Sequence, residues 1–91
     1  MRLYEAVFVF RADDVRFTEG RTFTKAELEK AGFAIKNETD LGEREMAYQV
    51  KKETKGHYYL YDVECPPDKI SSLDQTFRLK PEILKFLFTR K

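Results

Sequence analysis

Residues 57–77 read HYYLYDVECPPDKISSLDQTF, and their hydrophobic period changes at the pair of prolines in the middle. Before the prolines every second residue is apolar or aromatic, which predicts a β-strand with one buried face. The residues on that face are Tyr59, Tyr61, Val63 and Cys65. After the prolines, Ile70, Leu73 and Phe77 recur at helical spacing, and Asp68 favours a helix N-terminus. The stretch therefore predicts a strand that is followed directly by an amphipathic helix.

The segment before this strand, residues 34–51, is a long extended stretch in which the apolar positions change parity. These positions are Ile35 and Leu41 at odd numbers, then Met46, Tyr48 and Val50 at even numbers. Such a change requires an extra residue in the strand, and Gly42 is the natural position for a bulge. Residues 53–56, Glu-Thr-Lys-Gly, predict the hairpin turn into the strand at 57–65.

Two further strands and one further helix are expected nearer the ends of the chain. Residues 2–10 are rich in aromatic and β-branched residues, which predicts a strand. Apolar residues occupy both its odd and its even positions, so both faces of this strand are expected to be covered. The acidic pair at 13–14 can cap a helix that runs to about Ala31, with Gly32 as its terminator. Residues 83–89 are expected to form the last strand.

The expected order of elements is β-α-β-β-α-β in a single domain, residues 1–91. This order is that of the split βαβ, or ferredoxin-like, arrangement. It predicts an α+β fold with a four-stranded antiparallel sheet, two helices on one face and the opposite face open. The first and third strands are neighbours in this arrangement, so their outward-facing side chains are expected to lie together.

The composition limits the class of protein. The chain has 91 residues, 42% hydrophobic and 36% charged, which suits one folded soluble domain. No apolar run approaches the roughly 20 residues of a membrane span, and a lone Cys65 fits a reducing cytoplasm. The net charge is only +1, but residues 1–45 carry 8 Lys and Arg against 10 Asp and Glu, whereas residues 46–91 carry 9 against 6. The second half is therefore the more attractive half for phosphate.

The sequence contains no recognisable catalytic or metal-binding pattern. His57 is the only histidine, and we expect it to be a surface residue of its strand. Cys65 faces the core by parity and is expected to pack there as an inert thiol. No metal-ligand spacing and no Gly-rich phosphate loop is found. We therefore expect no catalytic residue, metal, cofactor or small-molecule substrate, and a protein that is not an enzyme.

Four stretches resemble one known protein family. They are MRLYE at Met1–Glu5, LGEREMAYQVKK at Leu41–Lys52, KGHY at Lys55–Tyr58, and the segment Pro81–Arg90 after the closing helix. In this order, and in a chain of this length, they are similar to the family of the sixth protein of the bacterial small ribosomal subunit. The chain departs from the family at Gln49, usually a proline, at Glu45, where some members are basic, and at Lys91, where many members continue into a tail.

The resemblance implies a structural constituent of the small ribosomal subunit. It implies binding to the central domain of small-subunit (16S) ribosomal RNA, together with small-subunit protein eighteen as a heterodimer. It also implies a cytoplasmic, ribosomal location and no membrane partner. The near-neutral charge is consistent with this role, because a basic partner protein can supply much of the neutralisation of phosphate.

Two sets of residues are candidates for these contacts. On the open sheet face, with Tyr58 as an anchor, the candidates for a protein partner are Leu3, Val7, Val9, Tyr48, Tyr58 and Leu60. The candidates for RNA are Arg2, Arg44, Lys51, Lys52, Lys85, Arg90 and Lys91. Arg44 is the strongest of these because it lies beside the expected bulge and its planar guanidinium can hold a phosphate with two hydrogen bonds.

Two other functions fit the same topology. Residues 55–62, KGHYYLYD, partly match the signature of an RNA recognition motif, which stacks single-stranded bases on the open face. Tyr58 and Asp62 depart from that signature. A small ferredoxin-like enzyme or ligand-sensing domain is the second alternative. An acylphosphatase-like enzyme would need an arginine and an asparagine around a phosphate, but Asn37, the only asparagine, lies within a strand.

Overall fold

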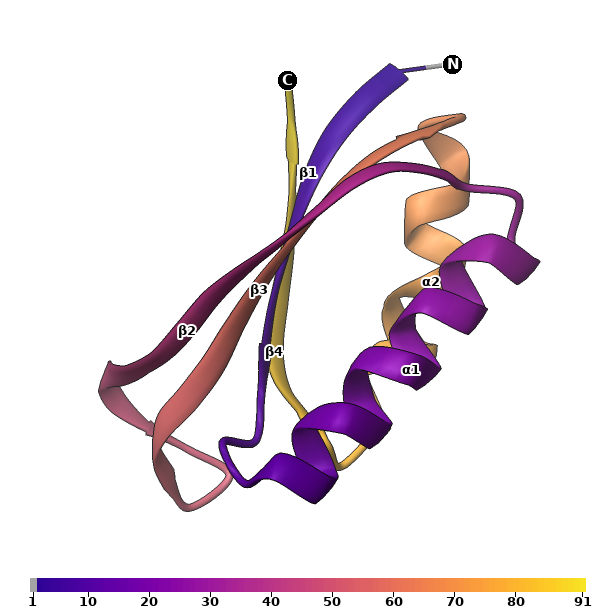
Figure 1. Cartoon of the computed structure of the whole chain (residues 1–91). Helices are drawn as coiled ribbons and strands as arrows, with labels where there is room; N and C mark the ends of the chain where they lie inside the picture. Colours follow the sequence, from indigo (N-terminus) through magenta and orange to yellow (C-terminus); the bar gives the residue numbers. More distant parts are fainter. Residues whose placement is uncertain (1) are drawn as a thin grey trace.

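The computed structural model describes residues 2–91 and contains the expected elements in the expected order. They are β1 (Arg2–Phe10), α1 (Asp14–Lys30), β2 (Ala34–Val50), β3 (Glu53–Cys65), α2 (Asp68–Arg78) and β4 (Ile83–Arg90). The strands form one sheet in the order β2-β3-β1-β4, and all neighbouring strands are antiparallel. Both helices lie on the same side of this sheet (Figure 1). The prediction of a ferredoxin-like α+β fold is therefore confirmed.

Helix α1 begins and ends at the predicted signals. Asp13 is its N-cap, and the carboxylate of Asp13 accepts a hydrogen bond of 3.2 Å from the amide of Arg16. Gly32, directly after the helix, has a φ of 89°, which glycine adopts at little cost. Gly20 lies where α1 packs closely on β1, since a Cβ there would be 2.7 Å from Cδ1 of Phe10. Close packing thus offsets the cost of a glycine inside a helix.

The hairpin turn between β2 and β3 lies before the predicted position. Residues 53–56 were expected to form the turn, but they belong to β3, and the turn consists of Lys51 and Lys52 with φ of 49° and 68°. Two consecutive residues with positive φ make the tight connection that suits the twist of a hairpin. Gly56 is a buried strand residue, and a Cβ at this position would be 2.2 Å from Cγ1 of Val9. Its missing side chain serves close packing across the sheet and not a turn.

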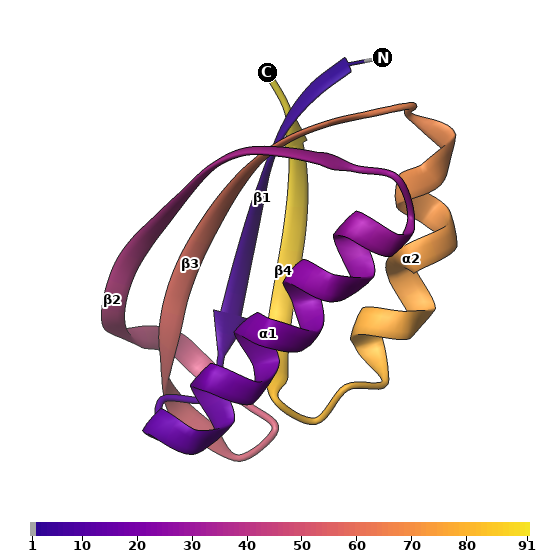
Figure 2. The same ribbon diagram turned by 45° about the vertical axis from the view of Figure 1, so that its right-hand side comes forward.

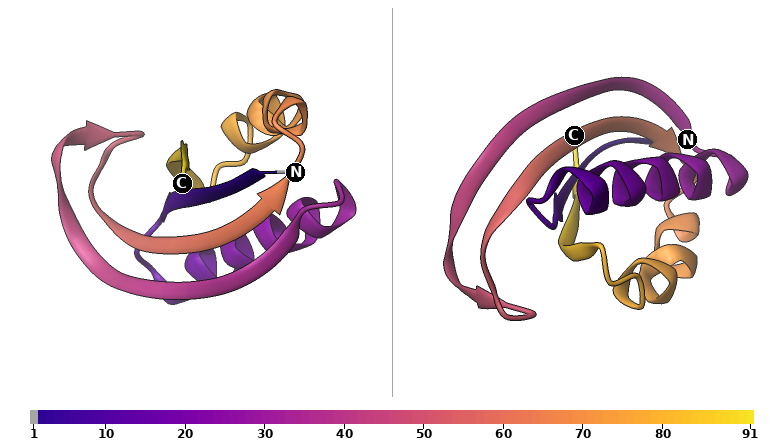
Figure 3. Two further views of the ribbon diagram at one scale, coloured as in Figure 1. Left: turned by 90° about the horizontal axis from the view of Figure 1, so that it is seen from above. Right: turned by 60° about the horizontal axis from the view of Figure 1, so that its bottom comes forward.

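Strand β2 is irregular, and this gives the sheet its curvature. The register of β2 against β3 shifts between Asp40 and Gly42, which confirms the predicted bulge. At this bulge the amide of Gly42 donates a 2.8 Å hydrogen bond to the side chain of Asp40, and Gly42 has a φ of 84°. Two further shifts were not predicted, one after Ile35 and one before Val50. Bulges increase the local twist and bend, and Figure 2 and Figure 3 show β2 and β3 curving together toward their shared hairpin.

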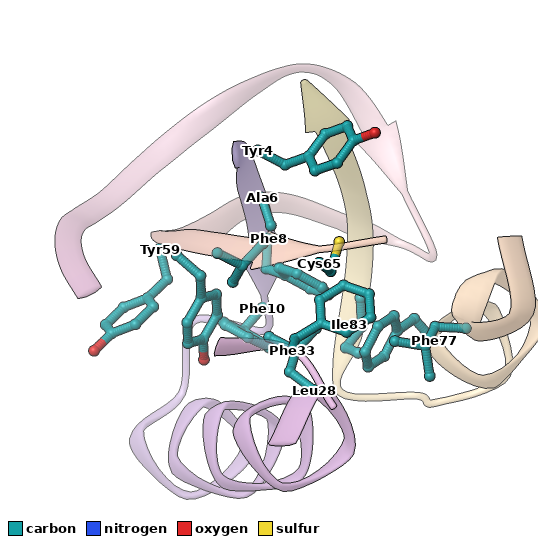
Figure 4. Close-up of a cluster of buried hydrophobic side chains, with 13 residues drawn as sticks. Tyr4, Ala6, Phe8, Phe10, Leu28, Phe33, Tyr59, Cys65, Phe77 and Ile83 are labelled. Carbon is teal, nitrogen blue, oxygen red and sulfur yellow. The ribbon is translucent and has the colours of Figure 1, made fainter. Parts of the chain in front are cut away.

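The main core fills the space between the helices and one face of the sheet (Figure 4). The fully buried ring of Phe8 contacts the ring of Phe77 on α2 edge-on, with 5.0 Å between the centroids. Leu28 of α1, Tyr61 and Cys65 of β3 are also fully buried in this cluster. The predicted inward parity of β3 is therefore confirmed, as is the core position of Cys65.

The curved hairpin builds a second, smaller core on the opposite face of the sheet. Met46 of β2 is buried with Val9 of β1 and Leu84 of β4, and Val50 and Tyr58 pack against them. We call these five residues the hairpin cluster. The open face is therefore covered at its hairpin end by the chain itself, although not by either helix.

Polar contacts attach the hairpin to neighbouring segments. The guanidinium of Arg11 lies 2.8 Å from the carboxylate of Glu53 and also donates a hydrogen bond of 2.9 Å to the carbonyl of Pro81. The ammonium of Lys51 donates a hydrogen bond of 2.7 Å to the carbonyl of Ile83 at the start of β4. The hairpin end is thus held in its curved position by charged groups as well as by the hairpin cluster.

Candidate functional site

Apolar side chains remain exposed in the middle of the open face, beyond the hairpin cluster. Val7 of β1 lies between Leu60 of β3 and Leu87 of β4 in the register of the sheet. Leu3, nearer the start of β1, is 47% exposed, and Leu87 is 64% exposed. We call Leu3, Val7, Leu60 and Leu87 the apolar stripe. The structure thus places Val7 and Leu60 of the predicted partner face beside Leu87, which was not predicted, and places Leu3 on the same face nearer the chain ends.

The signal for Leu87 was present but ambiguous in the sequence. Residues 86–88 are Phe, Leu and Phe, so apolar character alone did not show which of them face the helices. Phe86 and Phe88 pack against the main core, which leaves Leu87 on the other face. The register that places Leu87 opposite Val7 settles its position.

Carboxylates interrupt the apolar stripe toward the chain ends, where Glu5 lies between Leu3 and Val7 on the open face. Glu5 lies opposite Asp62, and Leu3 lies opposite Glu64, so all three carboxylates share the open face. We call Glu5, Asp62 and Glu64 the acidic flank. Lys91 pairs with Asp62 at 3.2 Å, and Lys36 pairs with Glu64 at 3.5 Å, whereas Glu5 forms no ion pair with any residue of 2–91. A carboxylate that is unpaired within the described residues, Glu5, beside exposed apolar residues suits a basic protein surface better than a phosphate of RNA.

The remaining predicted partner-face residues lie at the hairpin end. The expectation that Val9 is exposed was wrong: its side chain is only 2% exposed because Met46 and Leu84 cover it. Tyr58 is half-buried against the same cluster, with the guanidinium carbon of Arg44 5.9 Å from its ring centroid. Tyr48 is 73% exposed, apart from the apolar stripe.

The predicted RNA-binding cations do not form a single patch. Near the hairpin lie Arg44, Lys51, Lys52 and Lys85. Near the ends of the chain lie Arg2, Arg90 and Lys91. Strand β1 has 9 residues, so the two ends of the sheet are about 27 Å apart, and the nearest members of the two groups, Lys85 and Arg90, are about 17 Å apart along β4. The fold thus places cations at both ends of the sheet and places the acidic flank at the same end as Arg2, Arg90 and Lys91.

Lys51 differs from the other cations because its ammonium group is bound within the protein. It donates to the carbonyl of Ile83 at 2.7 Å and lies 3.5 Å from that of Lys80. Burial, followed by the nearby charge of Arg11, lowers the pKa of Lys51 below its ordinary value. Nothing in the sequence pattern indicates this contact, since Lys51 has the pattern of an ordinary lysine beside a hairpin.

The titratable residues that a catalytic site would use have structural partners. The ring of His57 stacks on Phe17 with 3.6 Å between centroids, and its Nε2 lies 2.6 Å from the carboxylate of Asp40. Burial raises the pKa of the Cys65 thiol, which disfavours the reactive thiolate. Within residues 2–91 no group of three or more histidine, cysteine or acidic residues is placed to hold a metal ion. No helix in this part of the chain is both long and apolar enough to span a bilayer.

The open face of β3 also differs from that of an RNA recognition motif. Such a module stacks bases on several aromatic rings of its sheet. Tyr59 and Tyr61 are buried in the main core, and the open face of β3 presents only one aromatic residue, Tyr58. The geometry therefore favours a protein-docking sheet face over a base-stacking one.

Comparisons with known proteins identify the family. The sequence profile described as Ribosomal protein S6 matches residues 3–90. Small ribosomal subunit protein bS6 of Treponema pallidum (strain Nichols) is 41% identical over 90 residues, which cover 99% of this chain and 97% of that protein. The corresponding protein of Treponema denticola is 38% identical with the same coverage. The crystal structure of 30S ribosomal protein S6 from Thermotoga maritima superposes with a TM-score of 0.81 at 25% identity, covering 99% of this chain and 87% of that one. This chain therefore belongs to the ribosomal protein S6 family of the bacterial small ribosomal subunit.

Proposed function

We propose that this protein binds the central domain of 16S ribosomal RNA as a heterodimer with small-subunit protein eighteen, and that it acts by binding and not by catalysis. Family membership makes it a small-subunit ribosomal protein, located on the ribosome in the cytoplasm, with a general role in RNA binding and translation. The observation that carries the proposal is the apolar stripe on the open face, with the acidic flank beside it.

The docking of a protein partner rests on exposure and charge. Leu87, which is 64% exposed, lies beside Val7, and Leu3, which is 47% exposed, lies on the same sheet face beyond Glu5. Exposed apolar patches mark interaction sites. Glu5 has no internal cation to neutralise it within residues 2–91 and favours a basic partner. A basic ribosomal protein that covers the apolar stripe would bury these leucines and neutralise the acidic flank in the same contact.

The binding of RNA rests on the cations at the two ends of the sheet. Arg44 and Lys52 are exposed near the hairpin, and Arg2 and Arg90 are exposed near the chain ends. Phosphate contacts from exposed arginine and lysine give affinity that falls with salt. With a net charge of +1, the protein alone supplies little neutralisation, so the partner would contribute part of the RNA contact.

Leu87→Lys tests the docking face, with Val15→Lys as a matched control. Both residues are exposed to a similar extent, 64% and 68%, but Val15 lies on α1, away from the open sheet face. A lysine at position 87 places a charge in the proposed apolar contact and repels a basic partner. We expect Leu87→Lys to weaken binding of purified protein eighteen by at least tenfold in calorimetry, while Val15→Lys binds normally.

The controls are the melting temperature of each variant and binding of the protein pair to a transcript of the 16S central domain. Equal affinity of Leu87→Lys and wild type for protein eighteen would place the docking face elsewhere. Failure of the wild-type pair to bind the transcript would refute the RNA part of the proposal.

A further inference from the structure

A cavity of about 290 Å³ lies between the second half of α2 and the start of β4, at the edge of the sheet. Its charged lining residues are Lys51, Asp74, Arg78 and Lys85. Phe77 and Ile83 provide apolar walls. The cavity thus has three cationic side chains and one carboxylate, and Arg78 was not among the residues that the sequence predicted to bind RNA.

The single carboxylate does not neutralise the cavity. Asp74 accepts a hydrogen bond from Nε of Arg78, one turn away on the same helix. A guanidinium carries five N–H donors, so Arg78 keeps its terminal nitrogens available for a second acceptor. The pair of Asp74 and Arg78 is electrically neutral, and Lys51 and Lys85 remain as excess positive charge.

Lys51 is held at the cavity in a fixed position. Its ammonium is bound to the carbonyl of Ile83 and lies near that of Lys80, which leaves one of its three N–H donors free. It forms no ion pair with any residue of 2–91. Its lowered pKa reflects burial and the charge of Arg11, for which the nearby charge of Glu82 compensates only in part. An anion in the cavity would complete that compensation.

The carbonyl groups at the end of α2 oppose an anion less strongly because two of them, those of Gln75 and Phe77, accept hydrogen bonds. The amide of Leu79 donates to Gln75, and that of Lys80 donates to Phe77. The carbonyl of Lys80 accepts from the amide of Ile83 at 3.1 Å as well as facing Lys51. The negative end of the helix dipole is therefore partly satisfied by internal hydrogen bonds.

An exposed aromatic ring beside the cavity indicates the chemical class of the ligand. The ammonium of Lys85, which lines the cavity, lies 5.9 Å from the ring centroid of Tyr48. Tyr48 is 73% exposed, so one face of its ring is free to stack. An acidic peptide would use the cations but has no need of the ring, whereas a nucleotide uses both. The combination favours single-stranded RNA.

We propose that this cavity binds a backbone phosphate of single-stranded RNA through Lys51, Arg78 and Lys85, with an adjacent base stacked on Tyr48. The inference rests on the proposed RNA-binding function and names a specific contact within it. It assigns Tyr48 to RNA instead of to the protein-docking face, where its sequence position had placed it.

The experiment titrates the ¹⁵N-labelled protein with an oligouridylate of about ten nucleotides and follows amide shifts and affinity at several salt concentrations. We expect shifts that centre on residues 83–86 and 48–51. Arg78→Gln should reduce the slope of log affinity against log salt by about 0.7. Lys69→Gln, which removes an exposed cation from the other end of the same helix, should leave the slope nearly unchanged.

The stacking contact is tested separately. Tyr48→Ala should weaken oligouridylate binding about tenfold, and Tyr48→Phe, which keeps the ring, should restore it. Leu79→Ala is the matched control because Leu79 is 72% exposed and lies outside the cavity lining. If Arg78→Gln weakens oligouridylate binding but Tyr48→Ala does not, a nucleotide ligand is refuted and an acidic peptide is favoured.

Equal effects of Arg78→Gln and Lys69→Gln, or shifts confined to other residues, would refute the cavity as the site. These outcomes are independent of whether the wild-type protein and protein eighteen together bind the 16S central domain. The proposed function and this inference can therefore fail separately.

Discussion

Replacement of Gly56 with alanine is expected to destabilise the hairpin end through a steric clash with Val9. A Cβ at position 56 would lie 2.2 Å from Cγ1 of Val9, 3.3 Å from the carbonyl oxygen of Phe10 and 3.4 Å from Cδ1 of Leu84. Overpacking of a close-packed site costs about 1–3 kcal/mol, and contact with paired strands on both sides leaves little room for relaxation. We therefore expect the free energy of unfolding to fall by about 2–3 kcal/mol, measured by urea denaturation with circular dichroism.

A double-mutant cycle identifies the cause. Val9→Ala removes the clashing Cγ1 but opens a cavity in the hairpin cluster, at a cost of about 2 kcal/mol by itself. In the double variant the added methyl group occupies part of that space, so the combined loss should be smaller than the sum by about 1–2 kcal/mol. Gly42→Ala is the control, because Gly42 has a φ of 84° with no atom within 4 Å, so its cost should add to that of Val9→Ala. If the losses in free energy of unfolding of Gly56→Ala and Val9→Ala simply add in the double variant, the packing explanation is refuted.

Three further predictions concern stability. Lys51→Met should lower the free energy of unfolding by about 1–2 kcal/mol because it removes hydrogen bonds to carbonyl groups, whereas Lys52→Met should change it by less than about 0.5 kcal/mol in the same urea assay. Burial raises the pKa of Tyr61, so its hydroxyl loses the proton at a lower pH in the unfolded chain than in the folded protein. The free energy of unfolding should therefore be unaffected below about pH 10 and should decline above it by up to about 1.4 kcal/mol per pH unit. Tyr61→Phe should flatten that decline in urea titrations between pH 9 and 11, and an unchanged slope would assign the effect to other groups. Asp13→Ala should cost about 1 kcal/mol through loss of the N-cap of α1, seen as a lower melting temperature, and an equal loss with Asp14→Ala would show that general charge and not capping is responsible.

The order of elements was predictable because periodicity depends on residues that are close together in sequence. The alternation at residues 57–65 and the helical spacing of Ile70, Leu73 and Phe77 both correspond to the structure. The hairpin turn was not predictable in this way. Gly56 has the local pattern of a turn residue, but the space its side chain would need is occupied by Val9 of another strand. Lysines are uncommon at positive φ, so Lys51 and Lys52 gave no turn signal.

The same limit applies to the binding surfaces. The position of Leu3, Val7 and Leu60 on the open face followed from strand parity, whereas the burial of Val9 depends on the bend of β2 that brings Met46 over it. Arg78 had the appearance of a cation at a helix C-terminus, and only the packing of α2 beside β4 places it next to Lys51. Contacts between segments distant in sequence decided each of these cases.

The low net charge of the protein is compatible with binding both RNA and a basic protein because its charges are separated in space. Electrostatic interactions at physiological salt decay over about 8 Å, and the two ends of the sheet lie about 27 Å apart. The acidic flank near the chain ends therefore has little effect on a phosphate at Arg44 or at the α2–β4 cavity. A basic partner on the apolar stripe would neutralise Glu5 and leave the cations of the hairpin end in excess. Neutralisation of Glu5 by the partner should accordingly leave oligouridylate binding at the hairpin end nearly unchanged, and Glu5→Gln should weaken partner affinity while also leaving oligouridylate binding unchanged.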